Sequence, residues 1–286
     1  MKFLVLPHIR IQNANALSSP YTIGFPAITA WLGAVHALER NLGGKFPDLK
    51  FPSVGIVSHW TDLQTYRGPH DYIHSIIGTA NPLDKNGERP SFVEEARIHL
   101  DVTLIVELDG IRRFSVQKRI LSEVAKLIKG RMKIAGGDIL PSSGEPVIEE
   151  LEHPSELMHI AGPGYALLER RDLMRQAMAE NADALDALIN ALALHHRCES
   201  SENKIRWESF RRYPGWIVPV AIGFMGISPL GKAVNARDPD VPHRFAESVI
   251  TLGEFRMPHR VDRLEEMLWR YRYDAENSLY LCETKQ

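Results

Sequence analysis

The chain has 286 residues, a formal net charge of −2 and 44% hydrophobic residues, which is typical of a folded globular protein and excludes a disordered, collagen-like or coiled-coil chain. It lacks the run of about 18 apolar residues that a membrane-spanning helix requires, and its first residues lack the pattern of a signal peptide. Cys198 and Cys282 are too few for a disulfide framework, so we expect a cytoplasmic protein with no membrane partner.

The first 141 residues alternate between strand and helix patterns. Apolar residues at every second position predict three strands, over residues 2–12, 54–58 and 97–108. Apolar residues at helical spacing predict two helices, over residues 26–42 and 116–129. Residues 132–140 predict a last strand, interrupted by Gly136 and Gly137. The order β-α-β-β-α-β predicts an α+β fold with a ferredoxin-like, RRM-like core over residues 1–141.

A long insertion separates the second and third predicted strands. Hairpin connections usually take two to five residues, whereas residues 59–94 contain two short alternating runs joined by a Gly-Pro turn. We predict a projecting β-hairpin, the thumb, followed by a turn-rich loop. The side chains that indicate a binding role for the thumb are Trp60, Tyr66, Arg67 and Tyr72.

Residues 142–286 predict a mixed, partly helical region that packs on this core. The predicted strands cover residues 165–168 and 216–224, and Pro219 favours an edge position for the second because proline cannot donate a ladder hydrogen bond. The predicted helices are two within residues 170–195 and one each over residues 245–252 and 261–271.

Motifs for a cofactor or a metal ion are incomplete. Residues 226–233 follow the phosphate-loop pattern up to its last position, where Ala233 replaces the Ser or Thr that binds magnesium. The run 195–198, His-His-Arg-Cys, has no second ligand pair at zinc spacing. We therefore expect neither a cofactor nor a metal ion.

A net charge near zero argues against a nucleic-acid-binding domain, but the charges are segregated. Residues 111–133 hold eight Lys or Arg and one Glu, whereas residues 143–186 hold ten Asp or Glu and three Arg. The basic segment leads into the Gly-Gly strand, where a backbone can approach a phosphodiester or another chain. From the residues alone, RNA contact and an ordinary solvated helix face are equally good interpretations.

Two further interpretations stay open. Two Pro-His-Arg triplets near the C-terminus form either an Arg/His surface for RNA or incidental charge at two helix starts. Twelve histidines also allow metal-independent RNA cleavage, which needs a base for the 2′-hydroxyl and a proton donor for the leaving oxygen. The histidines on or near the predicted core are His8, His36, His59, His70, His74 and His99.

Several short motifs occur in a fixed order between residues 9 and 269. They include residues 11–16 (Ile-Gln-Asn-Ala-Asn-Ala), 18–20 (Ser-Ser-Pro), 135–137 (Ala-Gly-Gly), 235–238 (Asn-Ala-Arg-Asp) and 258–261 (Pro-His-Arg-Val). Together they resemble the second Csy subunits of type I-F CRISPR surveillance complexes, which are Cas-five-type proteins. Residues 142–212 match that pattern poorly.

The resemblance implies a non-catalytic scaffold that caps the 5′ handle of the CRISPR RNA. It also implies pairing with the large Csy subunit and contact between the thumb and the first Cas-seven-type backbone subunit, while guide pairing reads the target. A metal-independent endoribonuclease that cleaves CRISPR repeats is the alternative, and a subunit that binds proteins alone is a third possibility. The residues expected at RNA are Asn13, Asn15, Ser18, Ser19, Arg97, Arg131, Lys133, Gly136, Gly137, Asn235, Arg237, Arg244, Arg256, His259 and Arg260.

Overall fold

The computed structural model describes residues 1–77, 83, 85–89, 95–111, 114–130, 132–141, 144–180, 182–201, 204–234, 236, 238 and 240–285. Three residues expected at RNA therefore lie outside the described residues: Arg131, Asn235 and Arg237.

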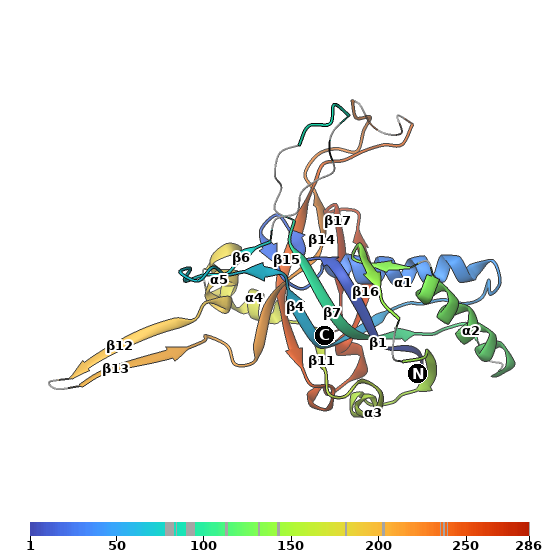
Figure 1. Cartoon of the computed structure of the whole chain (residues 1–286), viewed down its shortest axis with the longest axis horizontal. Helices are drawn as coiled ribbons and strands as arrows, with labels where there is room; N and C mark the ends of the chain where they lie inside the picture. Colours follow the sequence, from blue (N-terminus) through green and yellow to red (C-terminus); the bar gives the residue numbers. More distant parts are fainter. Residues whose placement is uncertain are drawn as a thin grey trace.

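One antiparallel sheet of eleven strands dominates the part of the chain that the structure describes (Figure 1). Its strands are β1 (Lys2–Asn15), β4 (Val54–Leu63), β7 (Arg97–Glu107), β8 (Lys133–Ile134), β9 (Gly137–Ile139), β10 (Val147–Glu150), β11 (Tyr165–Glu169), β14 (Trp216–Gly226), β15 (Ala246–Arg256), β16 (Leu268–Asp274) and β17 (Leu279–Glu283). The strand predictions for the first half are confirmed as elements, although β4 runs five residues further than predicted.

The prediction of a compact ferredoxin-like, RRM-like core is wrong. In such a core, β4 would be an edge strand, with β7 as its one neighbour. Here β4 also pairs with β16 at Gly55 and with β11 at Ser58. β1 takes β10 as a further partner. Strands from the second half therefore extend the sheet, because alternation in a sequence predicts that a strand exists but not which edge it will cover.

The added strands return to β4 and close a circuit of pairings. The circuit runs from β4 through β16, β17, β14, β15 and β11 back to β4. Trp269 is fully buried, and its indole N–H donates a 2.9 Å hydrogen bond to the carbonyl oxygen of Leu167. This bond satisfies the only polar group of the buried ring, as burial of a tryptophan requires.

Helices cover the outside of the sheet. α1 (Ile28–Gly43) buries one stripe, which includes Trp31, Val35 and Leu38, in the main hydrophobic cluster. α2 (Phe114–Gly130) lies beside it on the same side of the molecule (Figure 1). The shorter helices are α3 (Met158–Ala161), α4 (Arg171–Ala179) and α5 (Ala184–Leu192), so the prediction of two helices within residues 170–195 is confirmed.

Two helix predictions in the second half are wrong. Residues 245–252 lie mostly in β15, where the β-branched run Val249-Ile250-Thr251 favours a strand. Residues 261–271 contain a short 3₁₀-helix, η3 (Leu264–Met267), and then β16. β14 is also not an edge strand, yet it tolerates Pro219 because β17 pairs with it only at residues 223–225.

Among the described residues, three small hairpins lie outside the main sheet. β2 (Leu17–Ser19) and β3 (Thr22–Ile23) follow β1, and β5 (Thr65–Tyr66) and β6 (Ser75–Ile76) lie within the insertion. β12 (His195–Ser201) and β13 (Lys204–Phe210) form a long arm that projects from the body of the protein (Figure 1). No helix among the described residues is both long and apolar enough to cross a membrane.

Candidate nucleic-acid interface

One face of the strands β1, β7 and β4 changes character along its length. At one end it holds Phe3, Val5, Val57 and Ile105, which are fully buried beneath residues 154–161 and 261–268; we call this the covered half. Further along, the same face holds His8, Arg10, Gln12, Trp60, His99 and Asp101, which we call the open half. Since alternate residues of a strand share a face, the polar residues at 99 and 101 extend the row that ends in Ile105.

Two bulges mark the boundary between the halves. The register of β1 shifts between Leu6 and Ile9, and that of β4 shifts between Ser58 and Trp60. His8 lies in the first bulge with a left-handed φ of 48°, and His59 lies in the second. The bulges bring the two imidazole rings into a stack with centroids 4.1 Å apart.

His59 connects three segments through hydrogen bonds. Its Nδ1 lies 2.7 Å from the carbonyl oxygen of Pro163, which can only accept, so this nitrogen carries the proton. Its Nε2 then accepts from the Thr103 hydroxyl at 2.7 Å, and the hydroxyl oxygen accepts from the backbone N–H of His8 at 3.1 Å. Burial lowers the pKa of His59 below its ordinary value of 6.5, which favours the neutral ring that this pattern needs.

His8, His59 and Asp101 could in principle share a metal ion, because one possible ligand atom of each lies within 4.8 Å of the others. The imidazole planes, however, are stacked at 26° to each other, whereas a ligating histidine points a ring nitrogen at the metal in the plane of its ring. Both nitrogens of His59 also have hydrogen-bond partners, and His8 Nδ1 lies 3.1 Å from Asp101 Oδ1. This geometry suits a hydrogen-bonded network better than a metal centre.

A groove of about 430 Å³ lies on the open half. Its walls and floor are Arg10, Ile11, Gln12, Trp60, His99, Leu100, Asp101 and Leu140. The Trp60 ring is 54% exposed although the residue pairs with Asp101 inside the main sheet, so it belongs to β4 and not to the β5–β6 hairpin. The groove is therefore a half-apolar, half-polar site with one available aromatic face.

Residues from three separate segments meet where β1 ends. Asn15 pairs with Arg97 across the sheet, and its backbone N–H donates a 2.8 Å hydrogen bond to the carbonyl oxygen of Ala135. The β8–β9 turn thereby lies against residues 13–15. We call this edge the β1 rim, and its members from the predicted RNA set are Asn13, Asn15, Arg97, Lys133 and Gly136.

The two glycines of the β8–β9 turn serve different purposes. Ala135 and Gly136 both have positive φ, 50° and 75°, as a tight two-residue hairpin turn requires, and Gly136 faces open space. A Cβ atom on Gly137 would lie 2.8 Å from the backbone nitrogen of Ala14 and from the carbonyl oxygen of Gln12. The close approach at Gly137 is thus to β1 of the same chain.

The β1 rim carries both signs of charge. Lys133 forms a 2.7 Å ion pair with Asp138, and Arg97 pairs with Glu95. The ion pair of Lys133 is exposed on both sides, so it contributes little to stability and a phosphate can replace its carboxylate. Asn13 has a left-handed φ of 57° and an exposed side chain.

Ser18 and Ser19 are engaged in local structure. Their hydroxyl oxygens lie 2.8 and 2.7 Å from the hydroxyl oxygen of Thr22, and Ser19 is buried. These bonds close the β2–β3 hairpin. The Asn15 amide is also engaged, because its Nδ2 donates to the Leu17 carbonyl oxygen and its Oδ1 accepts from the Leu17 backbone N–H, each at 3.1 Å. The exposed amide of Asn13 is the one that faces outward.

The β5–β6 hairpin adjoins the β1 rim. The backbone N–H of Gln64, just before β5, donates a 2.9 Å hydrogen bond to the carbonyl oxygen of Arg97. Tyr72 is 96% exposed and Tyr66 is 62% exposed, while the Arg67 Nε–H donates to the Asp71 carbonyl oxygen at 2.9 Å. The tyrosine rings are therefore available for contacts outside the chain.

The remaining predicted residues that the structure describes do not join this site. Arg256 pairs with Glu254 at 2.6 Å, within a network that includes Arg170. Arg244 packs over Gly226, at the opposite end of β14 from Trp216. His259 and Arg260 lie in η2 (Pro258–Arg260), which contacts η1 (Pro154–Leu157) in an acidic part of the chain.

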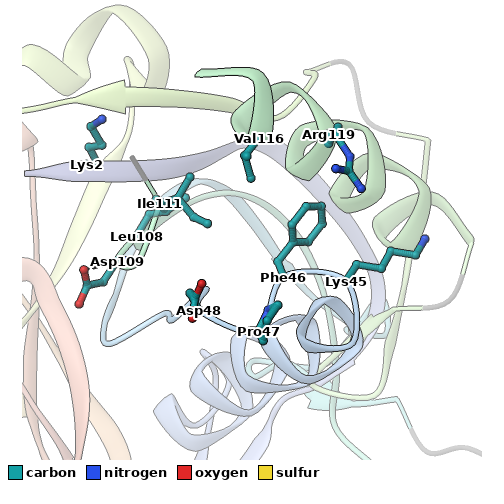
Figure 2. A pocket seen from close by; sticks show the side chains of 11 residues that line it. Lys2, Lys45, Phe46, Pro47, Asp48, Leu108, Asp109, Ile111, Val116 and Arg119 are labelled. Carbon is teal, nitrogen blue, oxygen red and sulfur yellow. Dashed lines mark hydrogen bonds between the residues drawn. The ribbon is translucent and has the colours of Figure 1, made fainter. Parts of the chain in front are cut away.

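The basic segment of residues 111–133 borders a larger hollow of about 790 Å³ near the start of α2 (Figure 2). Its cations already have partners. Lys45 pairs with Glu123, Lys2 pairs with Glu150, and the Arg119 guanidinium lies 5.7 Å from the centre of the Phe46 ring. On α2 itself, Lys126 pairs with Glu123 and Lys129 with Glu145. The positive charge that the sequence concentrates here is thus partly neutralised within the chain.

Of the six residues of the open half, the sequence points to His8, Trp60 and His99 but not to the other three. Arg10, Gln12 and Asp101 were not singled out, although the polar side of β7, residues 99, 101 and 103, is continuous with polar positions of β1. The available signal is a row of polar residues along one side of a strand whose other side is apolar. This pattern is typical of a strand with one face buried and the other open to solvent or to a ligand.

Comparison with known proteins identifies the class of the chain. A family model described as CRISPR-associated protein (Cas_Csy2) matches residues 4–282. The chain therefore belongs to the Csy2 family, the second subunits of the type I-F CRISPR class, and the resemblance seen in its motifs is confirmed. CRISPR-associated protein Csy2 of Pseudomonas aeruginosa is 34% identical over 314 residues, which cover 98% of this chain and 94% of the relative.

Proposed function

We propose that this chain is a non-catalytic RNA-binding scaffold that holds the 5′ handle of the CRISPR RNA in a type I-F surveillance complex. The observation that carries the proposal is that the β1 rim and the open half are neighbouring parts of one sheet, with the β5–β6 hairpin beside them. Membership of the Csy2 family supports the assignment to a type I-F CRISPR assembly.

The chemistry of these three parts fits single-stranded RNA. Exposed aromatic rings at Trp60, Tyr66 and Tyr72 offer stacking surfaces for unpaired bases. The exposed amide of Asn13 can read a base edge, and Lys133 can lie along phosphates. These groups come from segments far apart in the sequence, so only the folded chain presents them together.

Tight binding by the isolated chain is not expected, because the net charge is −2 and many cations have internal partners. The scaffold role therefore includes pairing with the large Csy subunit and contact with the first Cas-seven-type backbone subunit. A second basic surface, supplied by the partner, would add the phosphate contacts that this chain lacks.

The test measures binding of the repeat-derived 5′ handle RNA to the chain alone and to its complex with the large Csy subunit. We expect weak binding alone and strong, handle-dependent binding in the complex. Replacement of the exposed rim amide (Asn13→Ala) should weaken that binding, whereas Arg260→Ala, at an exposed cation away from the rim, should not. Equal binding of an unrelated RNA by the complex would contradict the proposal.

A repeat-cleaving endoribonuclease is the second candidate, because the structure brings His8 and His59 together. A general base and a general acid must reach two different oxygens of the reacting phosphodiester. Two rings in stacking contact, one with both nitrogens occupied, are poorly placed for this. Incubation of precursor RNA with the complex in chelator tests the point: intact RNA supports the scaffold, and one defined product would favour the enzyme.

A further inference from the structure

We infer that the groove on the open half is a pocket for a single unpaired nucleotide, whose base stacks on Trp60 and whose edge meets Gln12 and His99. This inference rests on the proposed function and names the part of the RNA that this surface takes. The groove is distinct from the β1 rim, where the sequence placed RNA contacts.

The shape of the groove favours one planar group. Its volume of about 430 Å³ lies within the range of about 300–1,000 Å³ usual for small-ligand sites. Ile11 and Leu100 are buried residues of its floor, and the exposed side chains of Trp60 and Leu140 also line it. A tryptophan left half exposed on a sheet, beside an apolar floor, is an arrangement on which a base can stack.

The polar groups of the groove have defined hydrogen-bonding roles. The backbone N–H of Asn13 donates to His99 Nδ1 at 3.0 Å, so in the neutral ring His99 Nε2 carries the proton and is a donor. Gln12 adds one donor and one acceptor from an exposed amide. A base that presents an acceptor to His99 and a donor–acceptor pair to Gln12 satisfies these groups.

The charge in the groove is balanced, which favours a base over a second phosphate. Asp101 is half-buried, with its carboxylate 3.1 Å from His8 Nδ1 and 3.8 Å from Arg10 Nε. The Arg10 guanidinium is more than half exposed at that longer distance, so it can reach the one phosphate attached to the bound base. Stacking supplies most of the affinity, and stacking depends little on salt.

The pocket also requires an unpaired nucleotide. In an A-form duplex the base faces are stacked on one another and unavailable to an aromatic side chain. Because the groove lies on the sheet between β1, β7 and β4, a base enters it only when extended from its neighbours. The site therefore selects a splayed position in a single strand.

The experiment uses the complex with the large Csy subunit and a set of handle RNAs in which each nucleotide in turn is abasic. With the wild-type chain, we expect one position at which loss of the base weakens binding about fivefold to 150-fold, the stacking contribution of one base. Trp60→Leu should weaken binding of the intact RNA by a similar factor, and it should remove the penalty of that one abasic position only.

Controls separate the pocket from folding and from the proposed function. Trp207→Leu is the matched variant, because Trp207 is 67% exposed on the projecting arm and does not line the groove. Gln12→Ala should reproduce the positional effect in smaller measure, and thermal unfolding should show that each variant folds.

The two possible failures are distinguishable. If the complex binds the handle but Trp60→Leu lowers affinity equally at every abasic position, or not at all, the pocket is wrong and the scaffold role stands. If the wild-type complex is indifferent to the handle, the proposed function itself fails.

Discussion

The covered and open halves of the β1–β7–β4 face are built on the same three strands yet serve opposite purposes. In the covered half, Phe3 and Ile105 have no exposed surface and pack under residues 154–161 and 261–268. In the open half, Trp60 and Arg10 stand on the same face with no such cover. The other face of these strands is mainly apolar and contributes to the main hydrophobic cluster together with α1.

The change between the halves takes place at the two bulges, where His8 and His59 stack. A bulge adds one residue to a strand and re-aims the side chains beyond it. The β1 bulge lies opposite Thr103, and the β4 bulge lies opposite the two residues of β7 that precede it. The Thr103 hydroxyl bonds to both histidines. The comparison teaches that burial fixes the scaffold at one end and leaves the same sheet free to bind at the other.

The strongest test of this division compares Phe3→Ala with Trp60→Ala. We expect Phe3→Ala to lower the free energy of unfolding by about 3–5 kcal/mol, because it removes a fully buried ring and leaves a cavity. Trp60→Ala should lower it by a smaller amount, about 1–2 kcal/mol, because about half of the ring is already exposed. Chemical denaturation of both variants measures the difference.

The handle-binding assay gives the complementary readout. Trp60→Ala should weaken RNA binding by the complex, whereas folded Phe3→Ala protein should bind normally. A large loss of stability in Trp60→Ala would show that the open half is also structural and would remove the contrast.

The next effect concerns two adjacent glycines that should lose stability for different physical reasons. Gly137→Ala should cost about 1–3 kcal/mol, because its Cβ would meet the backbone of Gln12 and Ala14 at 2.8 Å. Gly136→Ala should cost about 1–2 kcal/mol through its left-handed φ alone. Gly43→Ala is the control, since a Cβ there meets nothing within 4 Å at the end of α1.

RNA binding gives a second measurement for Gly137→Ala. Gly137→Ala disturbs the pairing of β9 with β1 beside Gln12 and should weaken handle binding together with stability. Equal stability of Gly137→Ala and Gly43→Ala would mean that β9 shifts freely and that the β1 rim is not held by this contact.

A smaller effect concerns pH. Because burial lowers the pKa of His59 below 6.5, the unfolded state takes up a proton first, so stability is full above pH 6.5 and falls as the pH drops through the folded-state pKa. His59→Gln should remove this part of the pH dependence. Melting temperatures of both proteins between pH 7.5 and 5 measure it, and parallel curves would contradict the neutral, hydrogen-bonded ring.

The strands and helices of the first half could be predicted because the spacing of apolar residues in each segment indicates which of its sides is buried. In β7 the apolar residues 98, 100, 102, 104 and 106 alternate without a break, and α1 repeats its apolar stripe over four turns. β15 and β16 were missed or misassigned, although Val249-Ile250-Thr251 and the alternating aromatics Trp269, Tyr271 and Tyr273 also favour strands.

The circuit of strands and the groove could not be predicted from local patterns. Which edge β11 or β16 covers depends on pairings over 100 residues apart, such as Tyr165 with Ser58. The groove likewise needs three strands in register before Gln12, Trp60 and His99 share one wall. By contrast, the β1 rim was partly predictable, because Asn13, Asn15 and the Gly-Gly pair are of turn-favouring types, although Asn13 and Asn15 prove to lie at the end of β1.

The smallest expected effect bears on the difference between the rim and the groove. Lys133→Ala removes one exposed cation whose ion pair with Asp138 is open to solvent, so stability should change by less than about 0.5 kcal/mol. If Lys133 meets a phosphate, the slope of log affinity against log salt concentration should fall by about 1 for the complex with handle RNA.

Trp60→Leu should leave that slope unchanged while it lowers affinity at every salt concentration, because stacking releases no counterions. Both slopes are measured between about 50 and 200 mM salt, a range over which a protein with six to ten phosphate contacts loses about 10³–10⁵ in affinity. The expected pair of slopes would assign charge to the rim and stacking to the groove. A changed slope in Trp60→Leu with an unchanged slope in Lys133→Ala would reverse that assignment.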